Sequence, residues 1–174
     1  MPLPTKIYSN NIKNDYFDDA MGKRGQQFIR GKKPSRSFHL AWQDLPQGTV
    51  SLALIFTDED AVPVCGFTWI HWTVANIDPS LKGLPENASQ EMNLLQGITS
   101  WSSGIISPDW RLSKEDDVGF GGCAPPDCDH RYTIELYALD KKLNLQPGFY
   151  KNELVWAMQG HILDKVTLYG IYKK

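Results

Sequence analysis

The chain has 174 residues, which suits one domain with a core of its own, and its formal net charge of −2 gives no sign of a nucleic-acid partner. Its three cysteines, Cys65, Cys123 and Cys128, are odd in number and form no CxxC pair, so neither a disulfide framework nor a zinc ribbon is indicated. The first residues carry no apolar run of signal-peptide length, and no run approaches a membrane span. We therefore expect a single domain over residues 1–174, a cytoplasmic location and no stable membrane insertion.

The first third of the chain leads to one strongly apolar run. Residues 1–36 are polar, and we expect irregular structure and short edge strands there. Residues 37–42 are compatible with a strand, and residues 43–48 are rich in turn formers. Residues 50–57, VSLALIFT, predict a central strand that is buried on both faces. Asp58 continues the parity of Leu52, Leu54 and Phe56, so we expect its carboxylate to face inward at the end of this strand.

A second strand is predicted over residues 67–77, FTWIHWTVANI. Strict alternation would place Trp69, His71 and Thr73 on one face and Trp72 on the other. A histidine among so many aromatic side chains is most often a buried core residue, and that interpretation of His71 stands beside a functional one. The next forty or so residues, 78–118, contain three prolines and an acidic run, and we expect a partly folded or functional connection.

The stretch from residue 119 to residue 139 combines a flexible loop with a strand. Gly119, Gly121 and Gly122 permit close approach of the backbone to a ligand, and Pro125 and Pro126 stiffen the loop. The residues that follow alternate with period 2, which predicts a half-buried strand. Extending its parity backwards puts His130 and Tyr132 on the core-facing side, beside the loop. The alternative is a loop that merely caps a strand.

The end of the chain predicts a helix and a last strand. Asn152 can cap a helix whose apolar positions are Leu154, Val155, Met158 and Ile162. Residues 166–172 then alternate as a strand. Two central β runs, many turn clusters and one late helix predict a mainly β sandwich.

Asp58, Asp60, His71, His130 and Tyr132 all fall near predicted strand ends and allow three chemistries. Two histidines with two carboxylates could hold a metal, but no HxH or HExxH spacing is present. A nucleophile would need a serine or cysteine elbow, and no GxSxG-like context exists. An anion could be held by loop amides, a histidine and a tyrosine hydroxyl. The aspartates would repel a bare anion unless they orient the histidines or bind a cationic end of the same ligand, as a zwitterionic head group would provide.

The motifs, taken together, resemble those of the phosphatidylethanolamine-binding protein family, and in particular its bacterial and archaeal branch similar to Raf kinase inhibitor protein. The family's W-x-D-x-P, D-x-D-A-P, HW-x-VANI and GG-x-x-PP-x-x-x-HRY motifs are matched in order. The matching stretches are Trp42-Gln43-Asp44-Leu45-Pro46, Asp58-Glu59-Asp60-Ala61-Val62-Pro63, His71-Trp72 with Val74-Ala75-Asn76-Ile77, and Gly121-Gly122 through Pro125-Pro126 to His130-Arg131-Tyr132. Two departures stand out, because Val62 is inserted before Pro63 and Cys128 stands where the family usually has glycine.

The resemblance implies an antiparallel Greek-key β-sandwich of two sheets, with a few short helices, one of them near the C-terminus. It also implies a small pocket for phosphate-like groups at one end of the sandwich. The ligand-binding residues that it assigns here are Asp58, Asp60, His71, Gly122, Pro125, Pro126, His130 and Tyr132. It weakens the interpretation of His71 and His130 as plain core residues.

We therefore expect a non-enzymatic ligand-binding module with a small anion pocket, with no catalytic residue, no metal and no cofactor. The expected ligand is a small anion or zwitterion such as phosphate or a phosphorylated head group. One alternative is an interaction protein whose surface inhibits a kinase or a protease, and a weaker one is a metal-dependent hydrolase. The protein partner, if any, and the question of a homodimer are left open by the sequence.

Overall fold

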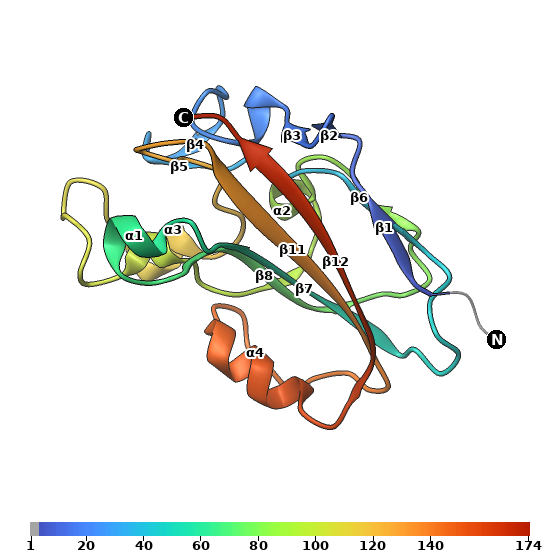
Figure 1. The fold of residues 1–174 in the computed structure, drawn as a ribbon. Coiled ribbons are helices and arrows are strands. Elements are labelled where there is room, and N and C mark those ends of the chain that lie inside the picture. Colours follow the sequence, from blue (N-terminus) through green and yellow to red (C-terminus); the bar gives the residue numbers. More distant parts are fainter. Residues whose placement is uncertain (1–3) are drawn as a thin grey trace.

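The computed structural model describes residues 4–174, so the first three residues of the predicted domain lie outside the described range. Figure 1 shows long strands that form one large sheet, with a helix against one of its faces. The strands are β1 (Lys6–Tyr8), β2 (Ile12–Lys13), β3 (Tyr16–Phe17), β4 (Phe28–Ile29), β5 (Lys33–Pro34), β6 (Leu40–Gln43), β7 (Ser51–Asp58), β8 (Trp69–Ile77), β9 (Gly83–Leu84), β10 (Leu95–Gln96), β11 (His130–Leu139) and β12 (Ile162–Tyr172). The helices are η1 (Asp19–Met21), α1 (Val62–Cys65), α2 (Ala88–Glu91), η2 (Ser100–Ser102), α3 (Lys114–Asp117) and α4 (Lys151–Met158).

The strands form one seven-stranded sheet, one three-stranded sheet and one two-stranded ribbon. Their orders are β10-β8-β7-β11-β12-β3-β2, β1-β6-β9 and β4-β5. The prediction of a mainly β fold with few helices is confirmed. The large sheet is mixed rather than purely antiparallel, because β3 pairs with β12 in parallel while the long strands pair antiparallel.

Strand β7 explains the apolar run at its position, because every one of its residues is buried. Leu52, Leu54 and Phe56 face the hydrophobic cluster that fills the space between the seven-stranded and the three-stranded sheet. Ala53 and Ile55 face a second cluster, which α4 covers from the other side. Figure 1 shows α4 on one side of the long strands and α2 with β6 on the other. A strand with both faces covered needs apolar residues at successive positions, which is the observed pattern.

The C-terminal helix is shorter than predicted. It starts at Lys151, with Tyr150 as its N-cap and the Glu153 carboxylate accepting from the Tyr150 amide at 2.7 Å. It ends at Met158, and Ile162 is the first residue of β12 instead of a helical position. Gln159 leaves the helical path with φ −57° and ψ 128°, and Gly160 follows with a φ of 77° in a turn in which the His161 amide donates to the Met158 carbonyl.

The connection over residues 78–118 is folded in short pieces. It contains the short elements β9, α2, β10, η2 and α3. This part of the chain is therefore partly folded rather than one long loop without secondary structure. In residues 4–174 no helix is both long and apolar enough to cross a membrane.

Candidate functional site

The predicted site begins with an ion pair between two strands. The Nδ1 atom of His130, the first residue of β11, lies 2.7 Å from Oδ2 of Asp58, the last residue of β7. The strands pair with Tyr132 opposite Asp58, which brings the two side chains to the same end of the large sheet. His130 is 1% exposed and Asp58 is 3% exposed. The predicted inward parity of Asp58, His130 and Tyr132 therefore holds in the structure.

The second ring nitrogen of His130 is bonded as well. Its Nε2 lies 2.8 Å from Oδ1 of Asp127, a carboxylate in the loop before β11 whose side chain is 52% exposed. Asp127 was not among the site residues predicted from the sequence. Its position three residues before His130, in the loop that was predicted to border the pocket, could have identified it as a candidate site residue. With a carboxylate at each nitrogen, the ring is held as a donor on both sides.

These contacts decide the charge of His130. Burial lowers the pKa of the ring, but the hydrogen bonds and charges of Asp58 and Asp127 raise it by more, so the pKa lies above the ordinary value. His130 together with its two aspartates carries more negative than positive charge. The same contact lowers the pKa of Asp127, with the His130 hydrogen bond as its largest cause.

His71 is placed by an irregularity in β8. Phe56 of β7 pairs with Trp72, and Thr57 pairs with Ile70, so His71 is the extra residue of a β-bulge. The predicted alternation is therefore wrong at this point. His71 packs against Phe56, with ring centroids 5.3 Å apart, although its neighbour Trp72 faces the same core.

The ring of His71 has a defined tautomer. Its Nδ1 lies 2.7 Å from the carbonyl oxygen of Gly121, which can only accept, so Nδ1 carries the hydrogen and Nε2 is a lone-pair acceptor. Burial lowers the pKa of His71 to about 4, because the desolvation outweighs the charge of Asp58. His71 is therefore neutral at physiological pH and cannot supply a positive charge to an anion.

Tyr132 contributes a hydroxyl without a partner. The side chain is fully buried among Phe17, Phe56 and His71, and its hydroxyl oxygen has no hydrogen-bond partner among the described residues. Burial is the main reason that the pKa of the phenol is raised, so the hydroxyl keeps its proton. A buried unpaired hydroxyl costs about 1 to 3 kcal/mol, and such groups often mark a functional position.

Asp60 lies further out than Asp58. It is exposed, and its Oδ2 accepts from the backbone amide of Arg131 at 2.8 Å. It therefore ties the loop after β7 to the start of β11 without contacting either site histidine directly. The inserted residue Val62 begins α1, a single turn that follows this loop.

The glycine-rich loop is held tightly in place. The amide of Gly121 donates to the His71 carbonyl at 2.7 Å, and that of Gly122 donates to the Pro34 carbonyl at 2.8 Å. A Cβ atom at Gly121 would lie 2.5 Å from the Trp101 ring, and one at Gly122 would lie 2.5 Å from a backbone oxygen. These glycines permit close packing, and their amides are not free donors for an anion as the sequence analysis expected.

The two prolines of the loop differ in their surroundings. Pro125 is buried and its carbonyl accepts from Lys23 Nζ at 2.5 Å, whereas Pro126 is exposed.

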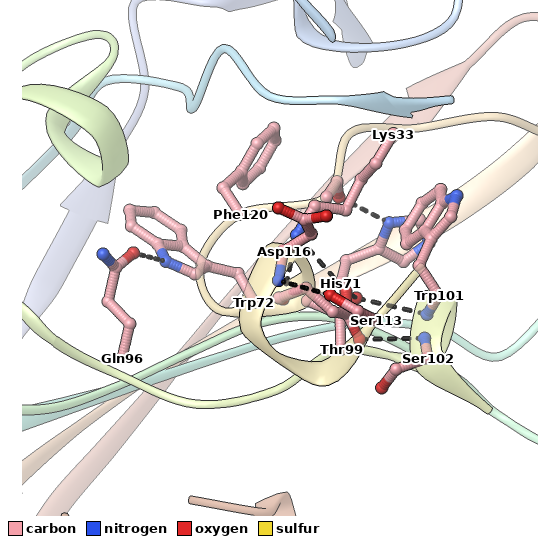
Figure 2. Close-up of polar contacts among 12 residues, drawn as sticks. Lys33, His71, Trp72, Gln96, Thr99, Trp101, Ser102, Ser113, Asp116 and Phe120 are labelled. Carbon is pink, nitrogen blue, oxygen red and sulfur yellow. Dashed lines mark hydrogen bonds and ion pairs between the residues drawn. The ribbon is translucent and has the colours of Figure 1, made fainter. Parts of the chain in front are cut away.

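A buried ion pair lies beside the glycine-rich loop. It was not predicted from the sequence. Lys33 and Asp117 have fully buried side chains, with Nζ 3.3 Å from Oδ1. The Asp117 carboxylate also accepts from the Thr99 hydroxyl and, at 2.9 Å, from the Ser102 amide. Figure 2 shows Lys33 beside His71 and Trp101, with Thr99 and Ser102 below. In the sequence, Lys33 follows Lys32 in a polar segment, and nothing there distinguishes it from a surface lysine.

Two hollows in the described surface have linings that do not include His130. One, of about 630 Å³, is lined by Ala20, Arg24, Gly25, Gln26, Gln27 and Arg36. The other, of about 390 Å³, lies beside α4 and includes Ile70, Tyr150 and Trp156. Neither hollow is lined by a predicted site residue. The polar groups that meet at His130 therefore do not line either hollow.

Comparison with known proteins gives a consistent result. The sequence profile described as phosphatidylethanolamine-binding protein matches residues 9–173. An uncharacterised Bacillus subtilis protein, YxkA, is 44% identical over 159 residues, which are 89% of this chain and 92% of YxkA. A UPF0098 protein of Methanothermobacter thermautotrophicus is 34% identical over 172 residues, covering 94% of this chain and 99% of its own.

Solved structures share the fold. A crystal structure of a phosphatidylethanolamine-binding protein homologue from Chlamydia trachomatis superposes with a TM-score of 0.78 at 28% identity, covering 98% of both chains. Escherichia coli YbcL, described as a member of the mammalian family, superposes with a TM-score of 0.76 at 24% identity, covering 99% of both chains. The second likeness bears on the fold alone.

Proposed function

Because the chain belongs to the phosphatidylethanolamine-binding protein family, we propose that it is a non-enzymatic ligand-binding protein for phosphate or a phosphorylated head group. The proposed site is the end of the large sheet where Asp58, His130 and Tyr132 meet. The names of the Bacillus subtilis and Methanothermobacter thermautotrophicus relatives state no ligand, so the proposal is argued from the geometry of this chain.

One observation carries the proposal. The Nε2–H of a buried, positively charged imidazole points at an exposed carboxylate, Asp127, in a loop. That carboxylate has the charge and the acceptor oxygens of a small anion. The buried face of the site is therefore built to donate to an oxyanion, and Asp127 fills the acceptor position when no ligand is bound.

The other groups favour a zwitterion over a bare anion. The unpaired Tyr132 hydroxyl is a second donor near the same ion pair. Asp127, once displaced, and the exposed Asp60 remain at the mouth and would repel a second negative charge. They would attract an ammonium group on the same ligand. Phosphoethanolamine has both ends, and we expect it to bind more tightly than inorganic phosphate.

The cysteines support binding over covalent catalysis. Cys123 is fully buried, and burial is the main reason that the pKa of its thiol is well above the ordinary value. The pKa of the exposed Cys128 is also raised, first by desolvation and then by Asp127. A thiol with a raised pKa is a poor nucleophile at neutral pH. All three cysteines are free, which is consistent with the cytoplasmic location that we propose.

Calorimetric titration of phosphate and of phosphoethanolamine into the protein tests the function. We expect measurable binding of both, with phosphoethanolamine the tighter ligand. His130→Gln should weaken phosphate binding by about 1.5 to 3 kcal/mol, because one charge-assisted hydrogen bond is lost. The matched control is His161→Gln, which changes a histidine paired with Asp140 elsewhere on the surface. No binding to the wild-type protein would instead favour the interaction-protein alternative.

A further inference from the structure

The loop before β11 holds a second set of donor atoms that the proposed anion site does not explain. A carboxylate oxygen of Asp127, the Sγ of Cys128 and a ring nitrogen of His130 lie within 4.8 Å of one another. Within residues 4–174 this is the one group of three or more His, Cys, Asp or Glu donors that comes together in this way. The metal set considered from the sequence was Asp58, Asp60, His71 and His130, and it included neither Asp127 nor Cys128.

The histidine of this set is oriented for coordination. Its Nδ1 is held at 2.7 Å by the buried carboxylate of Asp58, and the ring itself is buried. In protein metal sites, a carboxylate on the far nitrogen fixes the ring and strengthens the near nitrogen as a ligand. Asp58 therefore leaves Nε2 of His130 aimed at Asp127 and, next to it, Cys128.

The field around the three donors is negative. The Cys128 sulfur lies 3.7 Å from Oδ2 of Asp127, and the charges of Asp60 and Asp129 also act on it. The nearby Arg131 guanidinium lies over the ring of Tyr169 in β12, 4.9 Å from its centroid. Lys23, whose ammonium group reaches this loop, is bonded to the Pro125 carbonyl. Such surroundings attract a cation.

We infer that Asp127, Cys128 and His130 form a binding site for a zinc-like divalent cation, with Asp58 positioning the histidine. A nitrogen, a sulfur and an oxygen donor suit zinc, and three protein ligands leave one coordination position open. On binding, the metal replaces the proton on Nε2 and the proton of the thiol, and both protons pass to the solvent. The coordination bonds take the place of the Asp127–His130 hydrogen bond.

This inference does not depend on the anion site, although the two share one atom. A metal on Nε2 removes the hydrogen that would be donated to a bare anion, so direct anion binding and metal binding exclude each other at His130. Metal binding is therefore measured in phosphate-free buffer with the metal alone, and its failure leaves the anion test unaffected.

The experiment titrates Zn²⁺ into chelator-treated wild-type protein by calorimetry and Co²⁺ by absorption spectroscopy. We expect one metal per chain, and a thiolate-to-cobalt charge-transfer band in the near ultraviolet. Cys128→Ser should abolish the band and weaken zinc binding at least tenfold. Asp58→Asn should weaken it by about 10- to 100-fold with all three ligands retained. Asp127 and Cys128 are exposed, so Asp127→Asn and Cys128→Ser test the site even where Asp58→Asn fails to fold.

The matched control is Cys65→Ser. This thiol, in the last residue of α1, is bonded to the carbonyls of Ala61 and Phe67 on either side of that helix, and its removal should leave zinc binding and the cobalt band unchanged. Absence of metal binding by the wild-type protein would overturn the inference. Equal zinc affinities of wild type and Cys128→Ser would also overturn it, because the Cys128 thiolate would then not be a ligand of the metal.

Discussion

The Nδ1 atom of His130 and the Oδ2 atom of Asp58 lie 2.7 Å apart, although 72 residues separate them in the chain. This contact joins the end of β7 to the start of β11 and leaves Nε2 as the only ring atom directed at the loop. Both the proposed anion site and the inferred metal site depend on that orientation.

Replacing Asp127 should strengthen anion binding. Asp127→Asn removes the carboxylate that accepts from His130 Nε2 and removes one negative charge from the mouth of the site. We expect phosphate to bind at least several-fold more tightly to the variant in calorimetry, while zinc binds more weakly. Asp140→Asn, beyond the opposite end of β11, is the control and should behave as wild type. Weaker phosphate binding by Asp127→Asn would count against the proposal that the Asp127 carboxylate occupies the position of the anion when no ligand is bound.

The folded protein should lose stability in mild acid through His71. Its pKa is about 4 in the folded state and about 6.5 in the unfolded state. The unfolded chain therefore binds more protons between these values, and the free energy of unfolding falls by about 3 kcal/mol as pH drops through this window. The contribution is complete above the unfolded pKa and absent below the folded one.

The contribution of His130 to the free energy of unfolding changes with pH in the opposite direction to that of His71. Its folded pKa is raised, so its contribution is complete below about pH 6.5 and is lost as pH rises through the folded value. Carboxylates also titrate in acid, so ring NMR signals followed against pH give the cleanest readout. A His71 signal that titrates near its ordinary pKa would contradict the buried, neutral ring.

Breaking the buried ion pair should be costly. Lys33→Met leaves the Asp117 carboxylate buried without its cation, and removal of one partner of such a pair costs about 3 to 5 kcal/mol. Chemical denaturation measures this loss. Replacing Lys32, a neighbouring lysine that reaches the Arg111 carbonyl from a less buried position, should change stability by less than about 1 kcal/mol. A loss of unfolding free energy for Lys33→Met that is as small as the loss for the Lys32 variant would show that the ion pair contributes little to stability.

A methyl group at Gly121 should disturb the loop. Gly121→Ala places a Cβ 2.5 Å from the Trp101 ring, which is held between Trp69 and His71. We expect a loss of about 1 to 3 kcal/mol by overpacking. Gly104→Ala is the matched control, because nothing lies within 4 Å of its added Cβ and its φ is not in the left-handed region. Equal melting temperatures for both variants and wild type would refute the packing role.

Much of the fold could be predicted from residue patterns. The unbroken apolar run of β7 reflects a strand covered on both faces, and period 2 correctly placed His130 and Tyr132 inward. The bulge at His71 could not be seen, because it depends on how β8 pairs with β7 and not on β8 alone.

The site was predicted less completely than the fold. Asp58 and His130 were expected to converge, and they do. The loop amides were expected to be donors, but carbonyls of His71 and Pro34 occupy those of Gly121 and Gly122. Asp127 was missed because an acidic residue in an exposed loop looks like solvent-facing charge. Only the three-dimensional structure shows that its carboxylate reaches a buried imidazole.

The most direct test of the proposed function is the NMR spectrum of the histidine rings during titration with phosphoethanolamine. The chain has four histidines, so substitution can assign each ring signal. We predict that the Nε2 resonance of His130 shifts in proportion to bound ligand while the signals of His39 and His161 stay unchanged. A shift at the surface histidines with none at His130 would contradict the assignment of the ligand to the Asp58–His130 site.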